Sequence, residues 1–508
     1  MVEGVARVAG QVIWATHLEG VTSTTSQGGK GSGGSVESTE YTYYANFAVA
    51  LTDCTTRPIR HFGRIWADGK LLDTSDLTLR FYTGAESQEP DALIVAKDGG
   101  APAYRGVSYV VFERLNIEAF GRRIPNLTFE LWGPSGTMED LVRGVDIIPG
   151  ATEFGYAPGV ITKGTDGSTQ RENAIRSGAA SDWTNSMDLL QGVLPACDTV
   201  ALVVSWFGTD LRAAHARIEP RVETKEKTTS RPWSAGSLTR DTANLVSMVE
   251  GTPAFGSAPD DQSVMEAIAD LKARGLRVVL YPFVMMDIPA SNTLPDRDGA
   301  SGQAVYPWRG RIGPAAADGS VASQIAALFG TAVPGHFSAD GVPVYSGPDE
   351  WSVRRFILHL AALARNAGGV DAFLIGSELV DLTMATDTAG SYPFVDALVA
   401  LAAEIKAMLP GADISYAADW SEYHSHRTGG EVYFHLDPLW ASANVDFIGI
   451  DNYLPLSDWR PGTAHADYDA ANGTTSVYGL DYLKSQIEGG EYWDYYYASP
   501  ADRDTQTR

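Results

Sequence analysis

From residue 183 onwards the chain alternates between helix-like and strand-like segments, and this pattern constrains the fold more than any other feature. WTNSMDLLQGVLPACDTVALVVSWFG combines a helix at about 183–194 with an apolar strand at about 199–206. DDQSVMEAIADLKARGLRVVLYPFVMMDIP repeats the unit, with Gly275 as its helix stop. Such units, with near-continuous apolar strands, predict a parallel sheet covered by helices. No glycine-rich phosphate loop follows the first strand, so an α/β barrel is favoured over an open sheet.

The stretch DAFLIGSE, residues 371–378, is the centre of this pattern. A segment with apolar residues at helical spacing precedes it and stops at a Gly-Gly pair. The apolar run then closes on two small residues and Glu378. A buried parallel strand that ends in a carboxylate presents a catalytic group at a barrel mouth, so Glu378 is the predicted catalytic residue. Spacing alone leaves open that Glu378 caps the next helix or pairs with an arginine.

The active site of a barrel collects at the carboxyl ends of its strands, so the residues after each apolar run are the predicted binding residues. Their carboxylates and aromatic rings suit a sugar site, where two carboxyls act as acid and as nucleophile or base, and flat rings cover pyranose faces. A partly closed apolar pocket would keep one carboxyl protonated as the acid. Each aspartate could equally cap a strand end. The predicted substrate-binding residues are Trp206, Asp287, Asp419, Trp420, Glu422, Asp451, Asn452 and Tyr453.

Residues 1–134 follow a different pattern and predict a mainly β region. Several segments alternate apolar and polar residues, and Asp68-Gly69 is a strong two-residue hairpin signal. The Gly/Ser/Thr tract at 22–40 predicts a mobile loop at the tip of a hairpin. Residues 135–182, rich in Gly, Ser, Thr and Ala, predict a last strand of this region and an irregular linker.

Three motifs in this β region carry a resemblance to a known family. GQVIWAT, FGRIWADGKLLD and AYRGVSYVVFERLNIEAFGRRIPNLTFELW occur in this order within residues 8–132. They closely resemble the large baseplate hub protein at the tail tip of siphophages and phage-like gene transfer agents. The resemblance implies packing against a distal tail ring and neighbouring tail proteins, and a ring, taken as a trimer, of copies of the chain. Gene transfer agent hub proteins carry a TIM-barrel domain like a glycoside hydrolase, which extends the resemblance to about residue 465.

The resemblance also implies an order of strands in the barrel. In the retaining glycosidases that this domain resembles, the acid/base glutamate follows the fourth strand and the nucleophile lies on the seventh. If Glu378 ends the fourth strand, Asp419 and Asp451 end the fifth and sixth. No apolar strand ending in Glu follows, and Glu488 and Glu491 are poor substitutes.

The predicted fold is therefore multidomain, with a mainly β hub region (1–134), a last hub strand and linker (135–182), and a (β/α)8 TIM-barrel-like domain (183–508). The barrel is expected to lack its seventh and eighth strands and so to be incomplete at its C-terminus. Ser377 stands where the family often has Asn, which weakens the assignment of a working enzyme.

The implied function is a structural baseplate or tail-tip hub component, made in the bacterial cytoplasm and placed at the tail tip of a particle. Its barrel would bind or cleave host surface polysaccharide, with retention if it is active. A free-standing glycoside hydrolase with an accessory β domain is the alternative, and a barrel that binds without cleaving is a third reading. The sugar, its linkage and the stoichiometry stay open.

Composition and charge limit the kinds of partner that the chain is expected to bind. With 38 basic and 63 acidic residues the net charge is -25, and no basic run occurs, so direct nucleic-acid contact is not expected. No apolar stretch is long enough for a signal peptide or a membrane span, so no membrane insertion by this segment is expected. Cys54 and Cys197 are predicted as buried thiols. The usual zinc spacings are absent around His424 and His426, and no cofactor motif occurs, so neither a metal nor a cofactor is expected.

Overall fold

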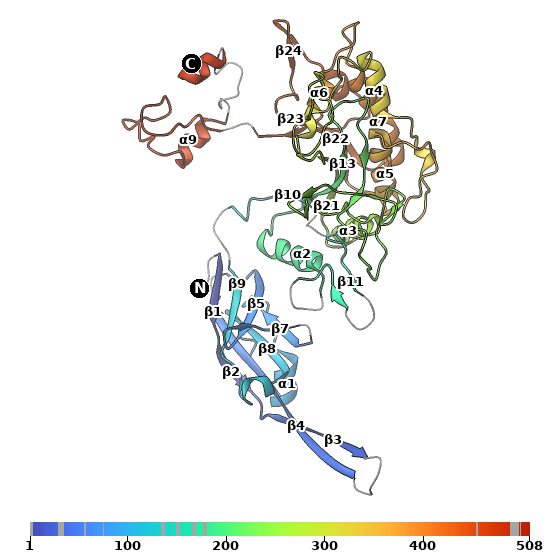
Figure 1. The fold of residues 1–508 in the computed structure, drawn as a ribbon. Coiled ribbons are helices and arrows are strands. Elements are labelled where there is room, and N and C mark those ends of the chain that lie inside the picture. Colours follow the sequence, from blue (N-terminus) through green and yellow to red (C-terminus); the bar gives the residue numbers. More distant parts are fainter. Residues whose placement is uncertain are drawn as a thin grey trace.

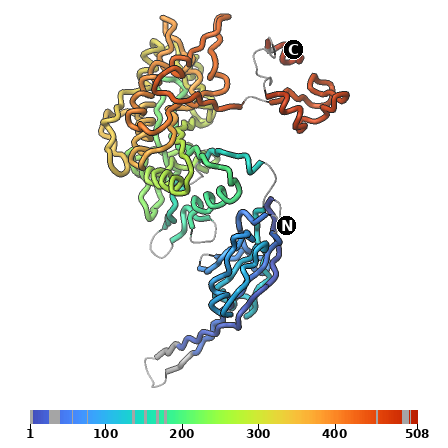
Figure 2. The backbone as a smooth tube through the Cα atoms, turned by 180° about the vertical axis from the view of Figure 1, so that it is seen from behind, coloured from blue at the N-terminus to red at the C-terminus, as the bar shows by residue number. Residues whose placement is uncertain are grey.

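The computed structural model shows a β-rich N-terminal body, a parallel α/β body and a small C-terminal segment (Figure 1). Figure 2 shows the same three parts from behind. The described residues are 4–28, 35–54, 57–74, 76–133, 138–148, 153–164, 169–175, 180–453, 456–487, 497 and 499–507. Within them, no helix combines the length and the apolar character that a membrane crossing requires.

The N-terminal body consists of two antiparallel sheets. One sheet has the order β1-β9-β5-β6, and the other has the order β2-β4-β8-β7 with β3 paired to β4. Their core includes Phe47 and Phe112, whose rings stack with centroids 4.7 Å apart. The elements are β1 (Val5–Ala9), β2 (Gln11–Ala15), β3 (Glu19–Gly28), β4 (Ser35–Asp53), β5 (His61–Ala67), β6 (Lys70–Leu71), β7 (Thr78–Tyr82), α1 (Ala92–Asp98), β8 (Val107–Asn116), η1 (Glu118–Phe120) and β9 (Leu127–Trp132).

The hairpin signal at Asp68-Gly69 is confirmed. β5 and β6 pair directly across it, and both turn residues have positive φ, 48° for Asp68 and 81° for Gly69. A two-residue turn of this kind matches the twist of the flanking strands, and glycine adopts the left-handed conformation without a steric cost. The turn is local chemistry, which is why its sequence predicts it well.

The Gly/Ser/Thr tract forms most of a long hairpin instead of a mobile loop. β3 pairs with β4 from Glu19↔Tyr44 to Gly28↔Ser35, and this hairpin projects from the body in Figure 1. The prediction of a hairpin is confirmed, but the loop expected at 22–40 is wrong for 22–28 and 35–40. The tract does not need to bury apolar area there, because the backbone ladder continues from the core strand β4. Residues 29–34 lie outside the described residues.

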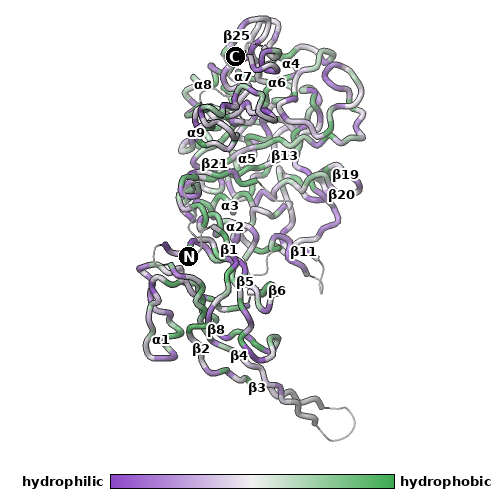
Figure 3. Tube along the Cα trace, turned by 90° about the vertical axis from the view of Figure 1, so that its left-hand side faces the viewer, coloured by the Kyte–Doolittle hydropathy of each residue, from purple (hydrophilic) through white to green (hydrophobic). Residues whose placement is uncertain are grey.

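The second body is built on six parallel strands in the order β10-β13-β21-β22-β23-β26, with β14 antiparallel to β13. β22 is the fourth of these strands and β26 the sixth, and among the described residues no further strand follows β26 in this sheet. Figure 3 shows hydrophobic residues gathered where β13, β21 and α5 lie together. The strands are β10 (Gly144–Ile147), β13 (Thr199–Gly208), β14 (Ile218–Glu219), β21 (Arg277–Met286), β22 (Ala372–Ser377), β23 (Asp413–Asp419) and β26 (Gly449–Asp451).

The sheet agrees with the expected TIM-barrel-like strand order through the sixth strand. Its first strand, β10, comes from residues that were expected to belong to the hub region. Instead, β10 pairs in parallel with β13, from Gly144↔Thr199 to Ile147↔Leu202. Val145 and Ile147 pack against the core of the second body. A strand of four residues carries too little pattern to indicate which of two sheets it joins, because the pairing partner lies far along the chain.

Helices cover this sheet, and their ends follow local rules. Ser352 caps α5, since its side chain accepts a hydrogen bond from the Arg355 N–H, and Gly368 and Gly369 have φ values of 90° and 88° just after the helix. The helices and 3₁₀ turns of this body are α2 (Asp182–Val193), α3 (Asp261–Ala273), η2 (Arg309–Arg311), α4 (Val321–Phe329), η3 (Pro334–His336), α5 (Val353–Asn366), α6 (Val380–Thr383), α7 (Pro393–Met408) and α8 (Asp437–Trp440).

Long connections and a C-terminal segment complete the chain. Cys54 is buried, as predicted, while Cys197 is only half-buried, and both thiols are free. Glu488 and Glu491 lie outside the described residues. The remaining short elements are β11 (Thr162–Lys163), β12 (Gln170–Arg171), β15 (Arg221–Val222), β16 (Ser234–Ala235), β17 (Leu238–Thr239), β18 (Asn244–Leu245), β19 (Met248–Val249), β20 (Thr252–Pro253), β24 (His426–Thr428), β25 (Glu431–Tyr433), α9 (Leu480–Ser485) and α10 (Pro500–Thr505).

Candidate functional site

Glu378 lies directly after β22, in an unusual backbone conformation. The pairing of β22 with β23 shifts register between Leu374 and Ser377, and Gly376 has a φ of 152°. Glu378 itself has a φ of 49°, in the left-handed region that a residue with a side chain seldom adopts. Its N–H donates to the Ala417 carbonyl at 2.8 Å, which ties this conformation to the next strand. A strained non-glycine residue at a strand end is a feature that often accompanies function.

The Glu378 carboxylate meets two neighbours from a distant loop. The Trp308 indole N–H donates to Glu378 Oε2 at 2.5 Å, and Arg309 Nη2 lies 2.9 Å from the same oxygen. Arg309 also donates to the Ser377 carbonyl at 2.9 Å and to Ser377 Oγ at 2.7 Å, while its guanidinium stacks 3.7 Å above the Phe283 ring. The pairing with an arginine that spacing left open is therefore present, and it lies at the strand end itself.

A second carboxylate, Asp451 at the end of β26, belongs to the same cluster. Its Oδ2 accepts hydrogen bonds from the Tyr281 hydroxyl at 2.5 Å and from Ser377 Oγ at 3.1 Å. Arg309 Nη2 lies 3.9 Å from it. Ser377 and Arg309 thus connect the two carboxylates, which come from the fourth and sixth strands of the sheet.

Burial and mutual repulsion change the acidity of this cluster. Burial raises the pKa of Glu378 to about 7 and Asp451 adds to the rise, while Arg309 and Trp308 oppose it. The pKa of Asp146 on β10 is also raised, by burial and by the nearby Asp451 carboxylate. A carboxyl with a pKa near 7 exists in both protonation states at neutral pH and can donate a proton. Glu378 is therefore the candidate for proton transfer at this site.

The structure brings several predicted residues to this end of the sheet. Tyr453 is 70% exposed, and burial together with Glu378 and Asp451 raises its pKa, so the phenol lies near both carboxyls. Asp419 is in register with Asp451 on the neighbouring strand and accepts a hydrogen bond from the Ser421 N–H at 2.9 Å. The Trp420 N–H donates to the Asp451 carbonyl at 3.2 Å, and Asn452 follows as an exposed residue.

Three predicted residues point elsewhere. Trp206 is 1% exposed and packs against Trp351 and Phe356. The even-numbered residues of β13 face the helices, whereas Val203 faces the inner side of the sheet, where it contacts residues of neighbouring strands. The other two engage partners of their own. Asp287 forms a 2.8 Å ion pair with Arg221 and also accepts a hydrogen bond from the Ser247 N–H at 2.9 Å. Glu422 is fully buried and accepts hydrogen bonds from the Tyr416 hydroxyl, the Asp419 N–H and the Thr383 hydroxyl.

Sequence reasoning missed Trp308, Arg309, Tyr281 and Asp146. Trp308 and Arg309 lie in the long connection between β21 and α4, where the only signal was an aromatic residue and a cation in the segment PWRGR. Tyr281 occupies an alternate position within an apolar strand, which marks it as inward-facing once the phase of β21 is known. Asp146 was hidden by the assignment of β10 to the hub region.

Other polar clusters have structural explanations. One oxygen each of Glu153, Glu172 and Glu223 lies within 4.8 Å of the others, a spacing that could hold a metal ion. Lys227 Nζ instead contacts all three carboxylates, at 3.1, 2.7 and 2.5 Å. The cluster is therefore a salt-bridge network around a lysine ammonium.

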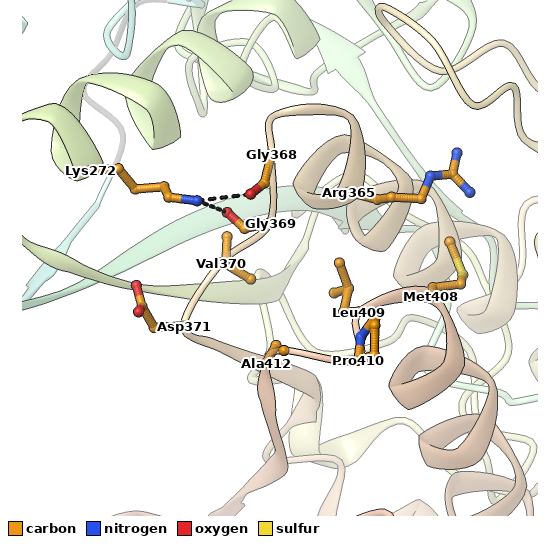
Figure 4. Close-up of a pocket in the computed structure, with 11 residues that line it drawn as sticks. Lys272, Arg365, Gly368, Gly369, Val370, Asp371, Met408, Leu409, Pro410 and Ala412 are labelled. Carbon is orange, nitrogen blue, oxygen red and sulfur yellow. Dashed lines mark hydrogen bonds between the residues drawn. The ribbon is translucent and has the colours of Figure 1, made fainter.

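A cavity lies at the opposite end of the sheet. It has a volume of about 380 Å³ and is lined by residues that precede β22 and β23, including Asp371 and Ala412. Lys272 Nζ donates to the Gly368 and Gly369 carbonyls at its edge, at 2.8 and 3.0 Å (Figure 4). The amino ends of barrel strands are associated with stability and the carboxyl ends with function, so the Glu378 cluster is the candidate site.

Comparison with known proteins gives a class for this part of the chain. Residues 351–508 match a family model described as the GTA TIM-barrel-like domain. The match includes β22, Glu378 and Asp451. It supports a protein related to gene transfer agents and phages, and it agrees with the sheet order described above.

Solved structures give weaker similarities. The virion of a native gene transfer agent particle has a chain 38% identical over 29% of this chain and 31% of its own, with a TM-score of 0.22, so the matched region is about a third of that component. A complex structure of the GH113 β-1,4-mannanase is 19% identical, and a structure of GH113 β-1,4-mannanase is 18% identical. Each covers 54% of this chain and 58% of its own, with a TM-score of 0.28. TM-scores this low do not establish a shared fold. No curated protein matches the chain.

Proposed function

We propose that this chain is a baseplate or tail-tip hub component of a phage tail or gene transfer agent particle, and that its barrel binds host surface polysaccharide. The family match over 351–508 and the hub-like motifs within 8–132 support the particle role. The chain would then be made in the bacterial cytoplasm and act at the tail tip. Its partners would be a distal tail ring, neighbouring tail proteins and copies of itself in a trimeric ring.

The observation that carries the glycan-binding part is the environment of Glu378. Burial raises the pKa of this carboxyl to about 7, and it lies beside a second carboxylate, Asp451, and the aromatic residues Trp308 and Tyr453. Sugar sites combine these groups, because carboxyls bind hydroxyls and rings cover the apolar faces of pyranoses. Asp419, Trp420 and Asn452, at the same end of the sheet, would contribute further contacts.

Hydrolysis is a second candidate function, which the raised pKa of Glu378 favours. A retaining glycosidase needs a nucleophilic carboxylate about 5 Å from the acid. Asp451 is the second carboxylate of this cluster, and Tyr281 and Ser377 already donate hydrogen bonds to it. The resemblance places the nucleophile on a seventh strand, and among the described residues no strand follows β26 in this sheet, so we expect the 508-residue chain to bind glycan and leave it uncleaved.

The N-terminal body would supply the assembly contacts. The β3–β4 hairpin projects from it and leaves Val21 43% and Tyr41 54% exposed. An isolated two-stranded hairpin is marginally stable in water, and its open edges favour pairing with another chain. Contacts between copies through this hairpin would therefore stabilise it. Deleting residues 1–134 should abolish incorporation into particles, and normal assembly by the barrel alone would contradict this role.

Binding is tested by titrating the chain, its Glu378→Gln variant and the Lys272→Ala variant with polysaccharide extracted from the host surface. The account expects binding by the chain, weaker binding by Glu378→Gln and unchanged binding by Lys272→Ala, because Lys272 lies at the opposite end of the sheet. Quantitative mass spectrometry of purified particles should find the chain at a fixed low copy number. Absence from particles together with release of reducing sugar would favour the free-standing hydrolase.

A further inference from the structure

Trp308 combines a buried polar contact with an open aromatic surface. Its indole N–H donates to Glu378 Oε2, while the residue as a whole stays 40% exposed. The next residue, Arg309, is only 5% exposed, so the chain turns inward directly after the ring. A large apolar surface therefore lies open beside a buried, proton-carrying carboxyl. Tryptophan suits such a boundary, because one edge of it is polar and its faces are apolar.

Gly310 fixes the position of this ring. A Cβ atom built on Gly310 would lie 2.5 Å from two carbons of the Trp308 ring and 2.7 Å from a third. The indole thus packs directly on the Gly310 backbone, and only glycine leaves the space for it. Hydrogen bonding to Glu378 at one edge and contact with Gly310 over the ring together hold the indole at the site.

Charge around the ring restricts what can bind there. Asp451 lies beside Glu378, and Asp146 lies near Asp451, so the site is acidic. Arg309 contacts Glu378 and Asp451, and it is already bonded to Ser377 and stacked on Phe283. A sugar carrying a carboxylate would be repelled by the carboxylates of this cluster. A neutral sugar avoids that repulsion.

We infer that Trp308 is the stacking platform for a neutral pyranose residue and that its indole N–H positions the Glu378 carboxyl beneath that sugar. The inference rests on the proposed glycan-binding function of the barrel and adds the residue and the sugar class. A pyranose on the exposed part of the ring would place its hydroxyls and ring oxygen near Glu378 and Asp451. Trp308 is thus a contact residue through its face and a positioning residue through its N–H.

The platform role is tested with defined probes. Binding of neutral gluco-, manno- and galacto-hexaoses and of hexagalacturonate would be measured by calorimetry on the full chain, Trp308→Phe, Trp308→Ala and Gly310→Ala. Tyr478→Ala, at an 88% exposed residue of the C-terminal segment, is the matched control for loss of a surface aromatic ring. We expect at least one neutral hexaose to bind, Trp308→Ala and Gly310→Ala to weaken it about tenfold, and Trp308→Phe to stay within about threefold because the ring is kept.

The positioning role has a separate readout, which requires no sugar. NMR titration of glutamate-labelled protein, with Glu378→Gln used for assignment, follows the ionisation of Glu378. Because the indole N–H stabilises the charged carboxylate, Trp308→Phe should move the pKa of Glu378 above about 7, a change that a purely structural role would not produce. If Gly310→Ala does not fold, the Phe and Ala variants at 308 still decide the question.

The outcomes separate this inference from the function on which it rests. Tight binding of hexagalacturonate, or neutral-sugar binding that Trp308→Ala leaves unchanged, would overturn the platform role while leaving glycan binding intact. An unchanged Glu378 titration in Trp308→Phe would overturn the positioning role. Failure of the chain to bind every hexaose and the host polysaccharide would overturn the proposed function itself.

Discussion

The two ends of the parallel sheet differ in whether their charged side chains are exposed or buried. At the amino end, a cavity of about 380 Å³ is bordered by Lys272, an exposed lysine that donates to the Gly368 and Gly369 carbonyls. At the carboxyl end, Glu378 and Asp451 share one arginine, and the backbone of Glu378 has a positive φ. A defined cavity thus lies where the chemistry is ordinary. The candidate site is therefore located by a buried carboxyl on a residue with positive φ, and not by the volume of a cavity.

A second contrast, between two buried glutamates, sharpens this point. Burial raises the pKa of both Glu378 and Glu422 to about 7. Glu422 is enclosed by Tyr416, Thr383 and the Asp419 backbone, whereas Glu378 contacts the partly exposed Trp308. A raised pKa therefore accompanies a structural role in one case and a candidate catalytic role in the other. Contact with a partly exposed aromatic ring distinguishes Glu378 from Glu422.

Of the variants that compare the two ends of the sheet, Arg309→Ala should show the largest change in unfolding free energy. Removing this buried guanidinium leaves Glu378 and Asp451 close together without a cation, so the variant should lose about 3 kcal/mol of unfolding free energy at pH 8. The loss should shrink near pH 5, where Glu378 is protonated. Urea unfolding at both pH values measures it, with Lys272→Ala as the control. Equal losses for the two variants would contradict the contrast between the ends.

The next effect concerns the pH dependence that the two glutamates cause. Both have folded-state pKa values raised to about 7, so the folded protein binds more protons than the unfolded chain between about pH 4.5 and pH 7. Stability from these groups is present below the unfolded pKa and is lost as pH rises through the folded pKa. Glu422→Gln should flatten the profile of unfolding free energy. An unflattened profile would show that another group carries the dependence.

A smaller effect is expected from Tyr281→Phe. This change removes the hydroxyl that donates to Asp451 and keeps the ring that packs in the strand interior, so the unfolding free energy should fall by about 1 kcal/mol. Tyr156→Phe is a matched variant, since the Tyr156 hydroxyl donates to the backbone carbonyls of Ile147 and Val203. We expect both to destabilise the protein and only Tyr281→Phe to weaken glycan binding. Equal effects on binding would argue against a role for Asp451.

The smallest effect should come from filling the amino-end cavity. Gly411→Ala adds a methyl group among its lining residues, where a Cβ atom meets nothing within 4 Å, and it should change the unfolding free energy by less than about 1 kcal/mol. Polysaccharide binding should be unchanged in calorimetry. A drop in affinity would move the binding site to the amino end and reverse the comparison on which the account rests.

The sequence predicted those parts of the fold that depend on near neighbours. The strand that ends at Glu378 and the turn at Asp68-Gly69 follow from local pattern, and both are confirmed. Trp206 was predicted at the site because its residue type suits a sugar site. Its side chain faces the helices instead, and the sequence did not show which residues of β13 face which side of the sheet. This orientation depends on which side the helices cover, which is a tertiary property.

The site itself was only half visible in the sequence. Glu378 and Asp451 were found as strand-end carboxylates, but Trp308 and Arg309 reach Glu378 from a loop 70 and 69 positions earlier in the chain. No local pattern marks a loop residue that folds back over a sheet. Asp146 was lost with β10, whose four residues could join either body until its partner was known.

The most direct test of the central claim is the titration of the Glu378 side chain, followed by NMR in the presence and absence of host surface polysaccharide. The account predicts a midpoint near pH 7 in the free protein, because burial outweighs the opposing effects of Arg309 and Trp308, and a shift of that midpoint when polysaccharide binds. A midpoint near the ordinary glutamate value of about 4.3, unmoved by saturating polysaccharide, would contradict the claim that the carboxyl end of this sheet is a glycan site.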